Sequence, residues 1–310
     1  MPEFEAFPKA TQRRFEFLEW RLFWERGLRR AGLESTFGIS TPQASVDLRN
    51  YRELAPDNID YDASQKTYVP GPRFKPKLLT LSADRLLLQL RAYLMGALGR
   101  QDLWFSEPPS MDGAPDLVRS VQPETLQRIL NAIRQRRKLE IDYRSLTNER
   151  RRTIAPHALA FDGHRWHVRA LCCEKDDFRD FVITRISAID LGARIDFDPA
   201  EDVEWARKVV LELAPHPGLN ADQRAAIEYD YGMTDGGRAV EMRIALSYYF
   251  IKRLNLDLET RLPEGALSPE RVQIALINLA EVEQAQADAK RDSVEQVRIR
   301  KALRVLDAGT

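Results

Sequence analysis

One segment in the N-terminal third has the pattern of two helices joined by a very short turn. The tripeptide Gly-Ile-Ser at 38–40 separates a predicted helix over residues 28–37 from a second one over 41–54. Ser40 and Gln43 have the S-x-x-Q spacing of a capping box, in which each side chain satisfies a free backbone N–H of the other residue. A helix, a short turn with glycine and a capped second helix form a helix-turn-helix unit, which restricts the N-terminal domain to a small class of folds.

The second of these helices has an apolar face and a polar face. Ala44, Leu48 and Tyr51 recur at the helical spacing i, i+4 and i+7, so we expect them to pack inward. Glutamine and arginine form paired hydrogen bonds with adenine and guanine edges, and arginine also neutralises phosphate. The alternative is a helical hairpin whose polar face only meets water. We expect DNA contacts from the outward side chains and from those near the N-terminal end of the helix, namely Thr41, Gln43, Ser45, Arg49 and Arg52.

A short β-hairpin is predicted immediately after this helix. Residues 59–61 and 67–69 are two runs typical of strands, and the polar turn between them contains Lys66. A hairpin in this place is the wing of a winged helix-turn-helix. Lys66, near the tip of the wing, is the side chain that we expect to contact a DNA phosphate.

Two more helices belong to the same domain. Residues 8–25 carry apolar side chains at helical spacing, and residues 82–98 have a stripe that includes Leu87 and Leu94, which we expect to face the core. A linker rich in proline follows the second helix. We therefore assign residues 1–105 to a winged helix-turn-helix DNA-binding domain with linking helices.

The rest of the chain predicts a small β-domain and then a small α+β domain. A helix over 123–137 leads into several short strands, and Asp162-Gly163 is a strong hairpin signal between two of them. We assign residues 119–200 to a β-sheet or barrel and residues 201–310 to an α+β extension, so the whole chain is an α+β multidomain protein. The central strands are expected at 139–145, 153–161, 166–173 and 181–186, the C-terminal strands at 209–213, 239–246 and 272–277, and the C-terminal helices at 221–231, 248–254 and 280–306.

Composition argues against several classes of protein. Apolar residues make up 44% of the chain and charged residues 30%, which is typical of a soluble folded protein. No run approaches the ~20 apolar residues of a membrane span, and the N-terminus lacks a signal sequence, so we expect a cytoplasmic protein with no membrane partner. Cys172 and Cys173 are adjacent and without partners, which argues against a disulfide framework or a zinc site. His164 and His167 lie three residues apart on a strand and point to opposite faces, so we expect no metal and no cofactor.

The zero net charge of the chain hides a cationic block in its middle. Residues 119–185 carry 15 Lys and Arg against 9 Asp and Glu, whereas residues 186–310 carry 16 against 22. A cationic block inside a neutral chain favours an anionic ligand at that place.

Strand alternation selects candidate ligand residues within this block. In the strand that begins at Trp166, the side chains of Trp166 and Val168 share one face, which we expect to be core, and those of His167 and Arg169 share the outward face. If the outward faces of neighbouring strands meet, their arginines, imidazoles and hydroxyls form a cradle for phosphates. The alternative is an exposed sheet face whose cations pair with the aspartates at 176, 177 and 180. The expected ligand residues are Tyr143, Ser145, His157, His167, Arg169, Arg179 and Arg185.

In its predicted winged helix and in this strand, the chain resembles the WYL-domain transcriptional regulators. It resembles in particular the repressors found beside bacterial phage-defence operons of the BREX and CBASS kinds. The segments that carry the resemblance are RLFWERG, FGISTPQASVDL, YDASQKTYV, FDGHRWHVRA and DFRDFVITRI, and they span most of residues 10–190. The tripeptide that names the domain is Trp166-His167-Val168 here instead of Trp-Tyr-Leu. Because this changes the middle residue, the ligand chemistry of other members does not carry over directly.

The resemblance implies a homodimer that binds an inverted-repeat operator on double-stranded DNA through its winged helices. It also implies a central β-barrel of the Sm or SH3 type that senses an anionic effector, either a nucleotide or a nucleic acid, and a C-terminal domain that supports dimerisation. The leading hypothesis is thus a ligand-controlled repressor with an antiviral defence role and no catalysis.

Two hypotheses from other classes stay open. The first is a nucleic-acid-processing enzyme in which His167, Arg169 and Asp180 cleave phosphodiesters, although no paired carboxylates or metal cluster accompany them. The second is a ligand-sensing scaffold whose N-terminal helices bind a protein instead of DNA. The sequence has no G-x-x-x-x-G-K, G-x-G-x-x-G or G-x-S-x-G motif, which argues against the common nucleotide-hydrolysing, dinucleotide-binding and hydrolase classes.

Overall fold

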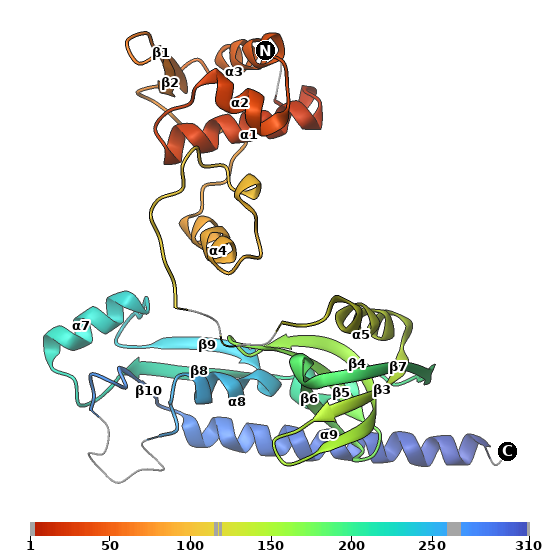
Figure 1. The fold of residues 1–310 in the computed structure, drawn as a ribbon. Coiled ribbons are helices and arrows are strands. Elements are labelled where there is room, and N and C mark those ends of the chain that lie inside the picture. Colours follow the sequence, from red (N-terminus) through yellow and green to blue (C-terminus); the bar gives the residue numbers. More distant parts are fainter. Residues whose placement is uncertain (1–3, 115–116, 118–119, 259–267, 309–310) are drawn as a thin grey trace. The chain divides into compact units, whose positions relative to one another are not determined.

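The computed structural model describes residues 4–114, 117, 120–258 and 268–308. The chain divides into two compact units, residues 1–117 and residues 118–310, and each is described here by itself. Figure 1 shows the elements of both units.

The first unit is a three-helix domain with a two-stranded wing, followed by a linking helix. The helix α3 occupies the residues predicted for the second helix of the helix-turn-helix, and Gly38 before it takes the left-handed backbone conformation (φ 62°) that suits glycine. The strands β1 and β2 pair antiparallel with Asp62 opposite Thr67, as expected for a wing. The elements are η1 (Phe4–Ala6), α1 (Lys9–Trp24), α2 (Arg30–Phe37), α3 (Thr41–Leu54), β1 (Ile59–Asp62), β2 (Thr67–Pro70), α4 (Ala83–Leu94) and η2 (Arg100–Asp102).

The core of this unit lies between α1 and α3. Ala44, Leu48 and Tyr51 are buried, which confirms their predicted inward direction. The fully buried Glu19 of α1 accepts a hydrogen bond from the Tyr51 hydroxyl and from the backbone N–H groups of residues 77–79, so it anchors the segment that follows the wing.

The inward stripe expected on the linking helix α4 is wrong. Leu87 and Leu94 are 62% and 42% exposed, whereas Leu86 is the buried residue of this helix. Apolar side chains lie on more than one side of α4, so helical spacing alone could not identify the side that packs against the unit.

The second unit begins with α5 and a five-stranded antiparallel sheet in the order β6-β5-β4-β3-β7. The Tyr143 hydroxyl on β3 accepts a hydrogen bond from the backbone N–H of Val182 on β6, although two strands lie between β3 and β6 in the sheet. The sheet is therefore strongly curled, as in a barrel, but among the described residues no ladder joins β6 to β7. The last strand, β7, was not predicted. The elements are α5 (Pro123–Gln135), β3 (Arg137–Arg144), β4 (Glu149–Phe161), β5 (Trp166–Cys172), β6 (Asp177–Val182), η3 (Ile183–Arg185) and β7 (Ile186–Arg194).

The described C-terminal part of this unit is a three-stranded sheet in the order β10-β8-β9 with four α-helices and one short 3-10 helix. The residues 244–246, predicted to end a strand, begin the helix α8 instead. The long helix α9 contacts both β8 and β6, so it connects the small sheet to the five-stranded sheet (Figure 1). The elements are η4 (Pro199–Glu201), α6 (Val203–Ala206), β8 (Lys208–Pro215), α7 (Ala221–Asp230), β9 (Arg238–Arg243), α8 (Ile244–Arg253), β10 (Ile274–Leu276) and α9 (Leu279–Ala308).

The five-stranded sheet is covered on both faces. Its inner face packs with α5 in a cluster that contains Ile129, Ile141 and Val168. Its other face packs in a cluster that contains Leu171 and, from α9, Val297. In the described part of the chain, no helix has the combination of length and apolar composition needed to cross a membrane.

Candidate nucleic-acid interface and ligand site

The helix α3 exposes most of the side chains predicted to contact DNA. Thr41, Gln43, Arg49 and Arg52 are exposed, and Ser45 is half-buried. The guanidinium groups of Arg49 and Arg52 make no hydrogen bond or ion pair with any other described residue. Both are therefore available for an external acceptor.

Gln43 and Ser45 are tied to their neighbours. The Ser40 hydroxyl accepts from the Gln43 backbone N–H at 3.4 Å, but the Gln43 side chain donates to Asp47 at 3.0 Å instead of returning to the Ser40 backbone, so only half of the predicted capping box forms. Asp47 is buried and accepts hydrogen bonds from Nε and Nη2 of Arg14 at 2.6 and 3.2 Å. Gln43 is thus oriented by a buried ion pair beneath the helix.

One residue of this surface was missed by the sequence reasoning. Val46 is 36% exposed on the same side of α3 as Arg49, three residues further on. A valine at such a place can contact the methyl group of thymine. Val46 lies outside the predicted buried stripe and three residues before Arg49, and this spacing is the signal that could have identified it.

Lys66 lies at the tip of the wing, exposed and in a left-handed backbone conformation (φ 51°). The Asp62 carboxylate closes the turn, because it accepts from the Ser64 hydroxyl and backbone and from the Gln65 backbone. These hydrogen bonds hold the pKa of Asp62 below its usual value.

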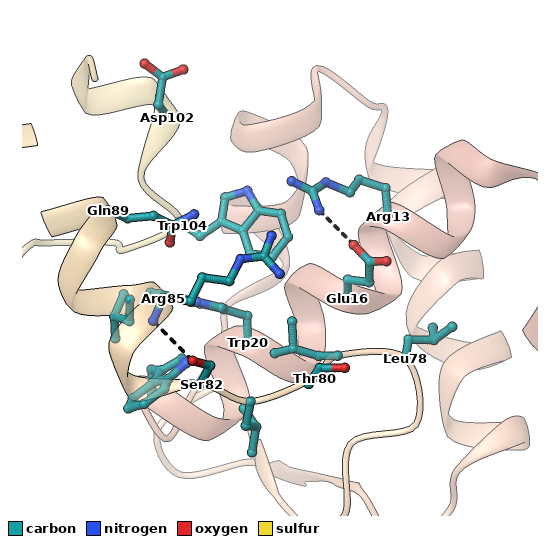
Figure 2. A pocket seen from close by; sticks show the side chains of 14 residues that line it. Arg13, Glu16, Trp20, Leu78, Thr80, Ser82, Arg85, Gln89, Asp102 and Trp104 are labelled. Atoms are coloured by element: carbon teal, nitrogen blue, oxygen red, sulfur yellow. Dashed lines mark hydrogen bonds and ion pairs between the residues drawn. The ribbon is translucent and has the colours of Figure 1, made fainter. Parts of the chain in front are cut away.

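A small cavity of about 230 Å³ lies between α1 and α4 in the same unit (Figure 2). Arg13 lies 4.2 Å above the ring of Trp104 and pairs with Glu16 at 2.8 Å. Arg85 is the second arginine of the cavity wall, and Asp102 is the second carboxylate. Because the two charges of each sign balance, we assign this cavity no ligand.

In the central sheet the expected ligand residues divide between two faces. Tyr143 lies on the inner face with Val168, whereas His157, His167 and Arg169 lie on the opposite face. The expectation that these side chains converge on one hollow is therefore wrong. Ser145 lies in the turn after β3, where its hydroxyl donates to the Asn148 carbonyl and accepts from the backbone N–H groups of residues 147 and 148.

Arg169, predicted to be outward, is 3% exposed and lies at the centre of a buried charge network. It binds Asp202 through two nitrogens at 2.7 and 2.8 Å, Asp180 at 3.2 Å and Glu204 at 2.9 Å. Burial lowers the pKa of Arg169, but its three carboxylate partners raise it more, so the net pKa lies above the usual range. Burial likewise opposes ionisation of Asp202, yet the hydrogen bonds from Arg169 and His157 leave its pKa below the usual value. Arg169 and Asp202 are therefore both charged at neutral pH.

Three side chains extend this network to the helices of the C-terminal part. His157 lies 2.9 Å from Asp202, and the Tyr249 hydroxyl of α8 donates to Asp180 at 3.0 Å. Lys290 of α9 donates to the Phe178 carbonyl at 3.0 Å. The network therefore joins β4, β5 and β6 to α6, α8 and α9, and we call it the Arg169 network.

The strand that begins at Trp166 is buried on both faces: Val168 and Ala170 lie in the core as expected, but the exposures of Trp166 and His167 differ from the expectation. His167 is 2% exposed and 2.8 Å from Asp162, and its ring packs against Tyr249. Trp166 is 51% exposed, and its ring packs against Phe161. The alternation along the strand is as predicted. The face of His167 is buried because C-terminal helices cover it, and Trp166 is exposed because it stands at the end of the strand.

The arginines that stay open to a ligand lie on the inner face of the sheet and in η3 after β6. Arg185 is half-buried and makes no bond with the rest of the described chain, and Arg179 pairs only with Asp177. Two further arginines were missed: Arg150 and Arg152 lie opposite Tyr143 and Ile141 in the β3–β4 ladder, and so on the same face. The Nε of Arg152 is buried and finds no hydrogen-bond partner among the described residues. The run of three arginines at 150–152 is the signal that could have identified them.

Comparison with known proteins identifies all three parts of the chain. Residues 10–92 match the BrxR transcriptional regulator winged helix-turn-helix domain, residues 124–191 the WYL domain, and residues 208–282 the BrxR transcriptional regulator C-terminal dimerization domain. The chain is 35% identical over 282 residues to the DNA-binding transcriptional repressor CapW of Escherichia coli (strain KTE188), covering 88% of this chain and 91% of the relative. It is 36% identical to the CapW repressors of Pseudomonas aeruginosa, over 88% of this chain and 91% of that one, and of Stenotrophomonas maltophilia, over 80% and 84%.

Proposed function

The chain belongs to the family of WYL-domain DNA-binding transcriptional repressors that end in a dimerization domain, and from this premise we propose that it binds an inverted-repeat operator as a homodimer and releases it under the control of an anionic effector. The observation that carries the proposal is the pair of free guanidinium groups, Arg49 and Arg52, on the exposed side of α3 beside a wing that exposes Lys66. We place the domain boundaries at residues 1–105, 119–200 and 201–310, and we take the controlled genes to be a phage-defence operon.

The operator should show the two-fold symmetry of the protein. In a homodimer each winged helix contacts one half-site, so the half-site centres should lie about 10 base pairs apart, or a multiple of that spacing. Footprinting on DNA upstream of the protein's own operon measures the spacing, and gel-shift titration against a scrambled duplex measures specificity. Equal affinity for both duplexes would reject specific regulation.

We place the effector on the inner face of the central sheet. Tyr143 and Arg179 from the predicted set lie there, and Arg150 and Arg152 add two cations. Arg185, also from the predicted set, lies in η3, the short helix that follows β6. The unpaired Arg152 Nε and the free Arg185 guanidinium support a partner with phosphate oxygens, which arginine binds through paired hydrogen bonds. Ser145, in the turn at the end of β3, is a further candidate.

The double variant Arg152→Ala/Arg185→Ala should keep full operator affinity and lose its response to the effector. Coupling between an effector site and a DNA site is typically about 1–3 kcal/mol, so induction worth roughly 5- to 150-fold in operator affinity should disappear. The measurement is mass spectrometry of the anions released from the denatured, freshly purified protein, followed by gel shifts with the anion found. Arg151→Ala is the matched control, because Arg151 is exposed and pairs with Glu140 and Asp190. Loss of operator binding in the folded double variant would contradict separate sites.

The structure supplies an argument against the nucleic-acid-processing enzyme. His167 and Arg169 are 2% and 3% exposed and are held by carboxylates, and Asp180 is bonded to both Arg169 and Tyr249. A phosphodiester cannot reach this group without displacing the C-terminal helices. We therefore give His157, His167 and Arg169 a different role from the predicted one: they join the central sheet to the C-terminal part.

A further inference from the structure

A second, larger hollow in the first unit has a strong excess of positive charge. Its volume is about 1020 Å³, and its walls come from the end of α1, from α2, from the wing and from the segment after η2. The charged side chains that line it are Arg21, Arg26, Arg29 and Arg100 against Glu25 alone. Four cations against one anion favour a polyanionic occupant.

Two of these arginines are available and two are engaged. Arg21 is buried and paired with Glu25, and Arg100 donates to the carbonyl groups of residues 105 and 106. Arg26 and Arg29 are exposed, and their guanidinium groups bond to no other residue that the structure describes. Arg26 also has a left-handed backbone (φ 57°), which is uncommon for a residue other than glycine and gathers at functional sites.

The hollow borders the wing directly and reaches the start of α2, which contacts α3. Arg30, next to Arg29 at the start of α2, donates to the Ser45 hydroxyl on α3 at 3.3 Å. On the other side, Gln65 and Thr67 line the hollow and flank Lys66 at the tip of the wing. The hollow thus lies beside the wing and the start of α2, and Arg30 connects this start to the recognition helix.

We propose that this hollow grips the sugar-phosphate strand of the DNA that runs between the groove occupied by α3 and the groove beside the wing, with Arg26 and Arg29 as the phosphate ligands. The inference rests on the proposed DNA binding. Adjacent grooves of a duplex are separated by one backbone strand, so a protein that reaches into both meets a row of phosphates between them. Arginine suits this place because its planar fork matches two phosphate oxygens. Such contacts add affinity and position the protein, and they carry no sequence information.

The test is the salt dependence of binding by the full-length double variant Arg26→Ala/Arg29→Ala. The probes are an operator duplex and a scrambled duplex of equal length, titrated by fluorescence anisotropy from about 50 to 200 mM salt. Each lost phosphate contact lowers the slope of log affinity against log salt by about 0.9, and in a homodimer the two substitutions remove about four contacts. We therefore expect a decrease of roughly 3 to 4 on both duplexes and an unchanged ratio of their affinities. The matched control is Arg85→Ala/Arg91→Ala, which removes two exposed arginines of the same unit that do not line this hollow.

Each outcome decides between the possibilities. An unchanged slope in a variant whose circular dichroism matches the wild type overturns the proposal, and so does an equal decrease in the control. A loss confined to the operator duplex would make these arginines readers of bases and would also overturn it. If the wild type binds both duplexes equally, specific repression fails but the slope on scrambled DNA still tests the hollow; if it binds neither, both inferences fail.

Discussion

Replacing Arg169 with alanine is expected to destabilise the second unit by about 3–5 kcal/mol, which is the range measured when one partner of a buried ion pair is removed. The variant leaves Asp202, which has no exposed surface, and the adjacent Asp180 without the guanidinium that neutralises them. Urea unfolding of the full chain, followed by circular dichroism, measures the change.

The control for this prediction is Arg179→Ala. Arg179 lies on the neighbouring strand and pairs with Asp177 at 2.7 Å, but nearly half of its side chain is exposed, so the loss should stay below about 1 kcal/mol. A similar loss of unfolding free energy in both variants would mean that burial does not make the Arg169 ion pairs more important for stability than an exposed pair. An unchanged stability of Arg169→Ala would mean that Asp202 finds another partner.

The pH dependence of the free energy of unfolding should differ in sign between the wild type and Arg169→Ala. In the wild type the pKa of Asp202 is lowered, so its contribution to stability is complete above its unfolded value, about 3.9, and is lost as the pH falls through the lower folded value. Without Arg169, burial dominates and raises the pKa of Asp202, so the variant gains stability as the pH falls. The difference in free energy of unfolding between the wild type and Arg169→Ala should therefore decrease as the pH falls from about 7 to about 4. A constant difference across this range would contradict the role given to Asp202.

Local signals were sufficient for the first unit. The helix α3 begins and ends where it was predicted, because Gly38 in a left-handed turn, the Ser40 cap and the apolar stripe at 44, 48 and 51 all act within a few residues of the helix. The wing likewise depends on a turn that closes through Asp62 and its next neighbours. The capping box formed only in part because Gln43 is attracted by Asp47, whose position depends on Arg14, a residue distant in sequence.

The central site depends on contacts that no local pattern records. Alternation along the strand at 166–172 correctly separated His167 and Arg169 from Val168, but it could not show whether the face of His167 and Arg169 would be exposed or buried. That choice is made by Asp202 and Glu204, more than 30 residues later, and by Tyr249 and Lys290, which lie further still along the chain. Positive charge in the middle of the chain therefore divides into two groups: Arg169 binds the C-terminal part, and arginines such as Arg150 and Arg152 on the inner face are those to which we assign the proposed effector.

The double variant Arg49→Ala/Arg52→Ala is expected to lose most of its specific DNA binding. A lost base contact costs about 1–3 kcal/mol, and in a homodimer each substitution removes its contact from both half-sites. Because both side chains are exposed and bond to no other described residue, the change in folding stability should stay within about 0.5 kcal/mol. Anisotropy titration on the operator and on scrambled DNA measures the two affinities, and the exposed Arg13 of α1 gives the control variant Arg13→Ala.

The two duplexes separate the ways in which these arginines can act. If they read bases, operator affinity falls towards the affinity for scrambled DNA, and the ratio of the two approaches one, because a base contact contributes only on the correct sequence. If they only neutralise phosphate, both affinities fall together and the salt slope decreases, as expected for Arg26 and Arg29. Unchanged affinity on both duplexes would remove α3 as the recognition helix and favour a protein partner for the N-terminal helices. Comparing this variant with Arg26→Ala/Arg29→Ala therefore tests whether α3 recognises bases while the arginines that precede Arg30 bind the DNA backbone.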